Sequence, residues 1–313
     1  MRYCVPYSSR FRYLKEVDEV ILPYIGIATK DGFVAHVTNI FSKKQRIIVD
    51  LNSINEINDS YIEKILPAIK YLIAEGWNIS ILIKQGQEEG IENVPYFFAN
   101  YPRNLEEVEA QIMAGATDIY VTESLGFYMK DLKAIKDKFG IQLRVIPNIA
   151  QCVPTARPYM SPMKKFWIRP EDTEIYEDYI DVFELMGGED NSRLSVIYEV
   201  YKQQQWLGTL NDIILDFGKR DILIIPNTGM NPHFAEMRLN CGKACIYTSC
   251  NLCDEMGVLA QVFDQAGLEV IKPRKKKERT EEEKQEILNS IKETANESRI
   301  NEDSNNSEPE TNI

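Results

Sequence analysis

Short apolar runs alternate with amphipathic stretches along most of this chain. Several of the runs are continuously apolar, which is typical of parallel strands that are buried on both faces of a sheet. Nine runs fit strands by length and by their content of β-branched and aromatic residues. These are Tyr3 to Tyr7, Val20 to Tyr24, Arg46 to Leu51, Ile79 to Lys84, Pro95 to Ala99, Asp118 to Thr122, Gln142 to Pro147, Phe166 to Ile168 and Val182 to Leu185.

The stretches between these runs have helical periodicity. Ser60 to Ala74 places its large aliphatic residues on one stripe, and Asn104 is positioned to cap a helix from Leu105 to Met113 that Gly115 ends. No Gly-rich phosphate-binding fingerprint follows any of the predicted strands. The pattern therefore favours an α/β fold of the (β/α)8 TIM-barrel type over a doubly wound sheet, and we assign it to residues 1–271.

The composition changes near Lys272. Residues 272–313 are rich in charged side chains and poor in apolar ones, so their last part cannot bury enough surface to order itself. Thr280 and Glu283 form a capping-box pattern, which predicts one helix from Glu281 toward Ala295. We expect a charged tail that is partly helical and otherwise disordered. Its basic run, Lys272 to Arg279, reads either as a solvated hinge or as a contact to RNA or a partner.

Charge and cysteine content narrow the class of protein. The 36 basic and 48 acidic residues give a net charge of -12, which argues against broad binding to phosphate backbones. The sequence shows no secretory leader and no apolar run of about 18 residues, so we expect a soluble, cytoplasmic protein without a membrane segment. Six cysteines are too few for a disulfide scaffold of this size. We therefore expect free thiols or metal ligands.

Most of these cysteines lie close together. Thiolates packed this closely in an intracellular protein are typical of metal or iron–sulfur ligands. A zinc site with four cysteine ligands suits the spacing C-x3-C-x4-C-x2-C as well as an iron–sulfur cluster does. A further cysteine, Cys152, lies in a Pro-interrupted loop from Asn148 to Met163 that follows a predicted strand. The clustered cysteines are Cys241, Cys245, Cys250 and Cys253.

The carboxyl ends of the strands are where a barrel places its chemistry. Carboxylates there suit acid–base roles, although barrels also carry such groups in structural ion pairs. Neither of the two histidines lies in a metalloprotease motif, and no serine-hydrolase elbow is present. The polar residues and thiol at predicted strand ends are Asn52, Asn100, Glu123, Asn148, Gln151, Cys152, Arg169, Glu171 and Glu184.

Three segments together resemble a known family. They are FWIRPEDTEIYEDYIDVFEL, MGGEDNSRLSVIYEVYKQQQWLGTLNDII and CGKACIYTSCNLCDEM. In this order they resemble the closing third of the barrel proteins of peptidase family U32, the collagenase-like peptidases. The resemblance extends over residues 95–256, and its most specific parts are the Arg169 to Asp172 segment, Cys152 and the closing cysteines.

The resemblance implies more than a fold. Some U32 proteins are peptidases, whereas others hold a 4Fe-4S cluster on four cysteines and take part in oxygen-independent hydroxylation of RNA bases or of a quinone precursor. By this resemblance the cluster ligands come from Cys152, Cys241, Cys245, Cys250 and Cys253, which are five candidates for four positions. We therefore expect Cys152 to lie near the closing cysteines. Arg169 is expected to orient an anionic group, and Glu171 or Glu184 to move protons.

The chain departs from the family pattern at the last strand of the barrel. Similar proteins carry a Lys and an Arg there, where this chain has Glu184 and Gly188. Three functions stay open. The first is an iron–sulfur enzyme, or a subunit of one beside a related partner, that modifies a small molecule or RNA. The second is a U32-type peptidase, and the third is a catalytically silent, metal-stabilised partner protein.

Overall fold

The structure is a computed structural model of the whole chain. It describes residues 1–23, 26–27, 29–52, 59–88, 90–122, 125–126, 128–150, 165–188, 191–215 and 225–241, with side chains of the α2 helix from 62 onward. The chain divides into two compact units, Met1–Glu269 and Val270–Ile313. The second unit, which contains the predicted tail, lies outside the described residues, so the first unit alone is considered below.

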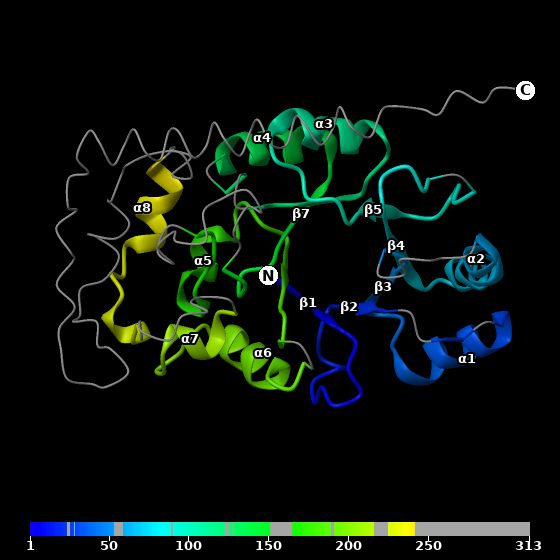
Figure 1. Ribbon diagram of the computed structural model, residues 1–313, viewed down its shortest axis with the longest axis horizontal. Coiled ribbons are helices and arrows are strands. Elements are labelled where there is room, and N and C mark those ends of the chain that lie inside the picture. Colours follow the sequence, from blue (N-terminus) through cyan, green and yellow to red (C-terminus); the bar gives the residue numbers. More distant parts are fainter. Residues whose placement is uncertain are drawn as a thin grey trace, which may run out of the picture. The chain divides into compact units, whose positions relative to one another are not determined.

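Eight parallel strands form the centre of this unit (Figure 1). Their order in the sheet is β5-β4-β3-β2-β1-β8-β7-β6, and all seven pairs of neighbouring strands are parallel. The two outer strands approach each other where the Thr117 N–H donates to the Tyr96 carbonyl at 2.9 Å, so the sheet is nearly closed into a ring. The strands are β1 (Arg2–Pro6), β2 (Glu19–Leu22), β3 (Arg46–Asp50), β4 (Asn78–Ile83), β5 (Tyr96–Phe98), β6 (Asp118–Tyr120), β7 (Gln142–Val145) and β8 (Val182–Glu184).

Helices lie outside the ring, and apart from the β1–β2 and β4–β5 connections they connect successive strands, which confirms the predicted (β/α)8-type fold (Figure 1). No helix among the described residues is long and apolar enough to cross a membrane. The helical elements are α1 (Lys30–Ile40), α2 (Asp59–Ala74), α3 (Leu105–Met113), α4 (Met129–Phe139), η2 (Pro170–Asp172), α5 (Thr173–Tyr176), α6 (Leu194–Gln203), α7 (Leu210–Ile213), η3 (Asn227–Gly229) and α8 (Phe234–Cys241).

Two predicted helices show how local sequence determines their ends. In α3 the Asn104 side chain accepts a hydrogen bond from the Glu107 N–H at 2.8 Å, as an N-cap residue should. Gly115 follows that helix with a φ of 96°, a conformation that favours glycine. In α2 the aliphatic stripe is buried against the sheet, with Ile65, Ile69 and Leu72 fully inside. Both predictions are therefore confirmed.

One predicted strand was wrong. Phe166 to Ile168 is not a strand of the sheet, because β7 pairs directly with β8. The segment lies beyond the carboxyl end of β7, where the Ile168 N–H donates to the Pro147 carbonyl at 2.9 Å. Its three side chains are buried. The apolar run is thus buried without forming hydrogen bonds of the sheet. The hydrophobic pattern alone does not distinguish such a segment from a strand.

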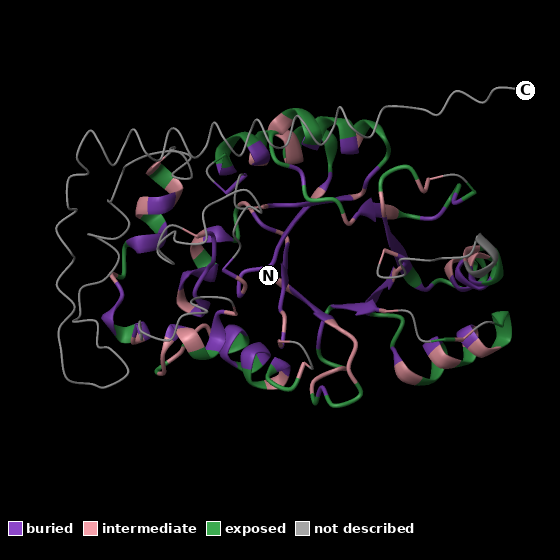
Figure 2. Ribbon diagram, viewed as in Figure 1, coloured by how far each residue is buried: buried purple, intermediate pink, exposed green. Residues whose placement is uncertain are grey.

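The core has one large part and one small part (Figure 2). The large part lies between the sheet and its helices, and β2 and β4 are buried on both faces as the continuous apolar runs predict. The small part packs α7 and α8 against the segment that follows β7, through Trp167, Leu210, Ile213, Ile225 and Phe234. This second cluster positions the end of α8 relative to the barrel.

Candidate functional site

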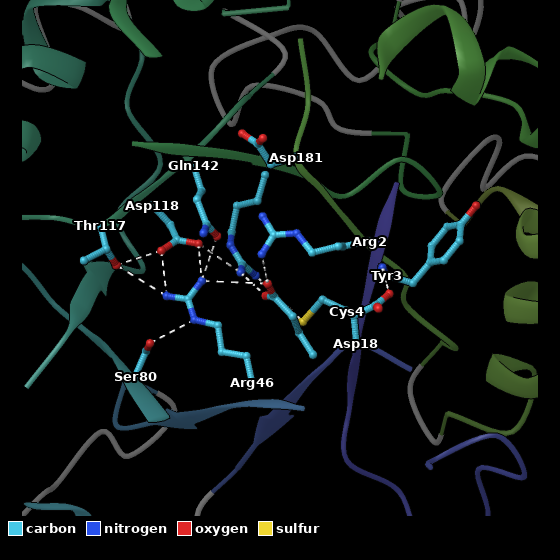
Figure 3. Close-up of polar contacts among 12 residues, drawn as sticks. Arg2, Tyr3, Cys4, Asp18, Arg46, Ser80, Thr117, Asp118, Gln142 and Asp181 are labelled. Atoms are coloured by element: carbon cyan, nitrogen blue, oxygen red, sulfur yellow. Dashed lines mark hydrogen bonds and ion pairs between the residues drawn. The ribbon is translucent and has the colours of Figure 1, made fainter. Parts of the chain in front are cut away.

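Charged side chains fill part of the barrel interior. They come from inward positions of five strands, and contacts between strands that are not neighbours show that they meet across the ring. For example, Arg46 on β3 contacts Asp118 on β6 (Figure 3). We call this set the barrel network, and it consists of Glu19, Arg46, Asp118, Arg144 and Glu184.

Arg144 is the centre of the barrel network. Its Nη2 lies 2.6 Å from Glu19 Oε2 and 3.2 Å from Asp118 Oδ1, and its Nη1 lies 3.0 Å from Glu184 Oε2. The side chain is fully buried, and its guanidinium lies 4.6 Å from the centre of the Phe97 ring. A buried cation that contacts three carboxylates and an aromatic face is held in one position.

Arg46 is the second cation of the barrel network. Its Nη1 and Nη2 each donate to an Asp118 oxygen at 2.7 Å, and its Nε donates to Ser80 Oγ at 2.9 Å (Figure 3). Burial alone would raise the pKa of Asp118. Arg144 and Arg46 outweigh that effect and lower this pKa from 3.8 to about 2. Asp118 is therefore an anion over the whole physiological range.

Glu184, a predicted proton-transfer residue, is the third carboxylate of the network. Its Oε2 accepts hydrogen bonds from Tyr120 Oη at 2.8 Å and from Arg144. Burial raises the pKa of Glu184, although Arg144 and Tyr120 act in the opposite direction. The Tyr120 ring meets the half-exposed Tyr101 ring edge-on at 5.1 Å between centres. Glu184 is therefore held by one cation and one hydroxyl, and Tyr101 lies between Tyr120 and solvent.

The structure shows how Glu184 and Gly188 are accommodated at and beyond the end of β8. The carboxylate of Glu184 is matched by the Arg144 cation inside the same barrel, so a negative charge at position 184 has a partner. Gly188 has a φ of 90°, a conformation in which a residue with a side chain is strained. Asn148 supports this end of β8, because its side chain bonds both the N–H and the carbonyl of Met186.

Arg169 begins the η2 segment and is buried. Its Nε and Nη2 each donate to an oxygen of Asp172 at 2.7 Å, which is a bidentate ion pair between residues three apart. Its Nη2 also lies 3.4 Å from the Asn231 carbonyl oxygen. The guanidinium is therefore occupied by a carboxylate of its own segment, and its predicted role toward an anionic substrate stays a prediction.

Glu171 lies apart from Glu184. Its Oε1 accepts hydrogen bonds from the Trp206 N–H at 2.5 Å and from Asn227 Nδ2 at 2.7 Å. Within the described part of the chain, Glu171 and Glu184 share no hydrogen-bond partner. The two predicted proton carriers therefore belong to different environments. Glu123 and Gln151, two other strand-end candidates, lie outside the described residues.

Of the five predicted cofactor ligands, Cys241 alone lies within the described residues. It is the last residue of α8, half-buried and not in a disulfide. Cys152, Cys245, Cys250 and Cys253 lie outside the described residues, so their expected proximity stays a prediction. In the described ranges, no group of three or more potential metal ligands lies together. A thiol at a helix end, from which three more cysteines follow in the sequence, fits the donor set that iron–sulfur clusters and zinc require.

Arg238 lies in α8 about one turn before Cys241 and binds this helix to residues that precede η2. Its Nη1 donates to the Trp167 carbonyl at 3.1 Å, and its Nη2 donates to the Lys165 carbonyl at 2.6 Å. Its guanidinium also lies 5.3 Å from the centre of the Phe234 ring. Lys165 is the first described residue after the segment that contains Cys152. Lys165 and Trp167 are therefore bound to the helix that carries Cys241.

Comparison with known proteins gives little further guidance. No family model matches the sequence, and no curated protein matches it. Among solved structures, the chain is similar to the U32 peptidase Mk0906, with 14% sequence identity and a TM-score of 0.37. The similarity covers 60% of this chain and 94% of the other. Nothing about the activity of this chain follows from a likeness at that level.

Proposed function

We propose that this chain is an iron–sulfur protein, with thiolates from residues 241–253 and Cys152 as ligands of a 4Fe-4S cluster. The observation that carries the proposal is the run of four cysteines, C-x3-C-x4-C-x2-C, whose first member ends α8. Arg238 supports it, because this residue binds the helix that carries Cys241 to Lys165, which lies 13 residues after Cys152 in the sequence. Soft, strongly donating thiolates are the ligands that such clusters take.

The proposed reaction is a redox-linked modification of RNA or of a small molecule, such as oxygen-independent hydroxylation. When bound, the cluster supplies one-electron transfer. The residues of the barrel supply proton transfer, for which Glu184 is suited because burial raises its pKa and because its carboxylate is hydrogen-bonded to the Tyr120 hydroxyl. Arg169 would then act at the edge of the site, whereas Glu171, which lies in a different environment, has no part in this reaction.

A specific observation favours a second candidate, a catalytically silent partner protein in which the cysteines bind zinc. Two of the predicted charged groups, Arg169 and Glu184, are engaged by partners within the chain, Asp172 and Arg144 respectively. Charged groups that are paired within the chain in this way need no substrate to complete them. The two candidates differ in the metal that the cysteines hold.

The peptidase alternative has less support. Hydrolysis of a peptide needs an activated water or a nucleophile with its base. His36 packs against the rings of Tyr7 and Phe41, and the exposed His233 pairs with Glu236. Neither histidine contacts a serine or a cysteine among the described residues. We therefore expect no intrinsic protease activity.

Cysteine variants test the proposal. Cys250→Ser and Cys253→Ser, purified without oxygen, should lose iron and sulfide relative to the unsubstituted chain. Cys4→Ala is the matched control, since it removes a thiol that is buried on β1 beside Arg144. Stoichiometric zinc in a colourless protein would favour the silent partner. Cleavage of gelatin or casein that resists chelators and persists in both serine variants would establish the peptidase instead.

A further inference from the structure

A hydrogen-bonded carboxylate–carboxamide pair lies outside the barrel network. Glu171 on η2 and Asn227 on η3 meet beside Trp206, where Asn227 Nδ2 donates to Glu171 Oε1 at 2.7 Å and to the Trp206 carbonyl at 2.8 Å. Glu171 Oε1 also accepts the Trp206 N–H. The pair therefore joins three segments that are distant in sequence, namely η2, the loop after α6 and η3.

Each member of this pair has one oxygen without a partner. Glu171 Oε2 and Asn227 Oδ1 are both inaccessible to solvent, and neither has a hydrogen-bond donor within the described part of the chain. The amide of Asn227 cannot be turned to remove the problem, because its Nδ2 already donates to two acceptors. Asn227 is only 4% exposed. Each residue of this hydrogen-bonded pair thus has an inaccessible acceptor oxygen with unsatisfied lone pairs, which is rare in folded proteins.

The charge of Glu171 is also unmatched. The cation next to it in the sequence, Arg169, is bound to both oxygens of Asp172. No ion pair to Glu171 is present among the described residues. A buried water would supply hydrogen bonds to the two open oxygens but would leave the anion uncompensated. A cation supplies both, and a buried charge is stable only when it is paired.

We propose that Glu171 Oε2 and Asn227 Oδ1 bind a monovalent cation, a potassium, sodium or ammonium ion. Carboxylate and carboxamide oxygens are hard ligands that suit such ions and not soft metals. A single carboxylate matches a single positive charge, whereas divalent calcium usually takes six to eight oxygens that include several carboxylates. The ion would hold η2 and η3 together around Trp206. This site is independent of the closing cysteines and of the redox reaction proposed above.

Thermal unfolding of the full chain in different salts tests the site. The protein is measured in choline chloride, and choline is then replaced stepwise by sodium, potassium or ammonium at constant ionic strength. At least one of these ions should raise the unfolding midpoint by about 3 °C with saturation, as expected for a ligand at roughly ten times its Kd on a chain of this size. Equal midpoints in all the salts would overturn the proposal in favour of a buried water.

Two variants locate the ion. Glu171→Gln should abolish the difference between choline and the small cation, whereas the control Glu174→Gln should keep it, because Glu174 lies on the same segment and is exposed. If Glu171→Gln does not fold, Asn227→Ala takes its place, since it removes the second open oxygen. A cation-specific rise that persists in the folded variant would place the ion elsewhere and refute the assignment. Loss of iron or sulfide in the cysteine variants has no bearing on either outcome.

Discussion

Replacement of Arg144 by methionine should strongly destabilise the barrel. The substitution keeps an unbranched side chain in the interior but removes the cation that contacts Glu19, Asp118 and Glu184 at 2.6–3.2 Å. Glu19 and Asp118 still have Arg46 nearby, at 3.8 Å and 2.7 Å. Glu184 keeps only the Tyr120 hydroxyl among the described residues. An uncompensated buried carboxylate costs about 3–5 kcal/mol of unfolding free energy.

Urea unfolding followed by circular dichroism measures this loss. With a slope of about 2 kcal/mol per molar urea, the expected cost lowers the midpoint by about 2 M. Lys133→Met is the matched control, since Lys133 is 44% exposed and its partner Asp137 is 61% exposed. That ion pair is worth less than about 1 kcal/mol, so the control should unfold almost like the unsubstituted protein.

A double variant separates charge from packing. Adding Glu184→Gln to Arg144→Met removes the uncompensated charge. The unfolding free energy of the double variant should therefore be at least about 1 kcal/mol higher than the sum of the two single losses predicts. If Arg144→Met costs less than about 1 kcal/mol and shows no coupling to position 184, the reasoning that Arg144 compensates the buried charge of Glu184 is refuted.

Three further predictions concern pH and helix capping. The pKa of Asp118 falls from 3.8 to about 2 on folding, so its ionised form contributes about 2 kcal/mol of stability that is complete above pH 4 and is lost as the pH falls to 2. In urea unfolding measured at a series of pH values, Asp118→Asn should lose less stability between pH 4 and pH 2 than the unsubstituted chain does. Burial lowers the pKa of His36 from 6.5, so its contribution is complete above that pH and is lost below it. Thermal midpoints between pH 7 and 5 should therefore depend less on pH in His36→Gln but not in His233→Gln, an exposed site. Asn104→Ala removes the N-cap of α3 and should cost about 1 kcal/mol in the same urea assay, whereas no measurable loss would contradict the observed cap.

Much of the fold could be predicted because local patterns and tertiary burial agree. Continuous apolar runs identified the eight strands that form the ring, and the Asn104 cap together with Gly115 gave both ends of α3. The exception was Phe166 to Ile168, where burial comes from packing over the end of β7 and not from a ladder. The pattern of apolar residues indicates which side chains are buried. A strand also needs backbone hydrogen bonds to a neighbouring strand, which a single sequence does not reveal.

The barrel network was not predicted, although its signal is present in the sequence. Glu19, Arg46 and Arg144 each stand in or beside a run of buried aliphatic residues, where an ionised group requires a partner. Which charges pair depends on strand order, since Arg46 on β3 meets Asp118 on β6 only across the ring. The same holds for Glu171 and Asn227, which are joined by contacts between segments distant in sequence.

The iron and acid-labile sulfide content of the anaerobically purified, unsubstituted chain tests the central claim most directly. A 4Fe-4S cluster on the cysteines of residues 241–253 and Cys152 predicts about four iron atoms and about four sulfides for each chain, with a brown colour that fades on reduction. A colourless protein without iron or sulfide, whether or not it contains zinc, would contradict the account.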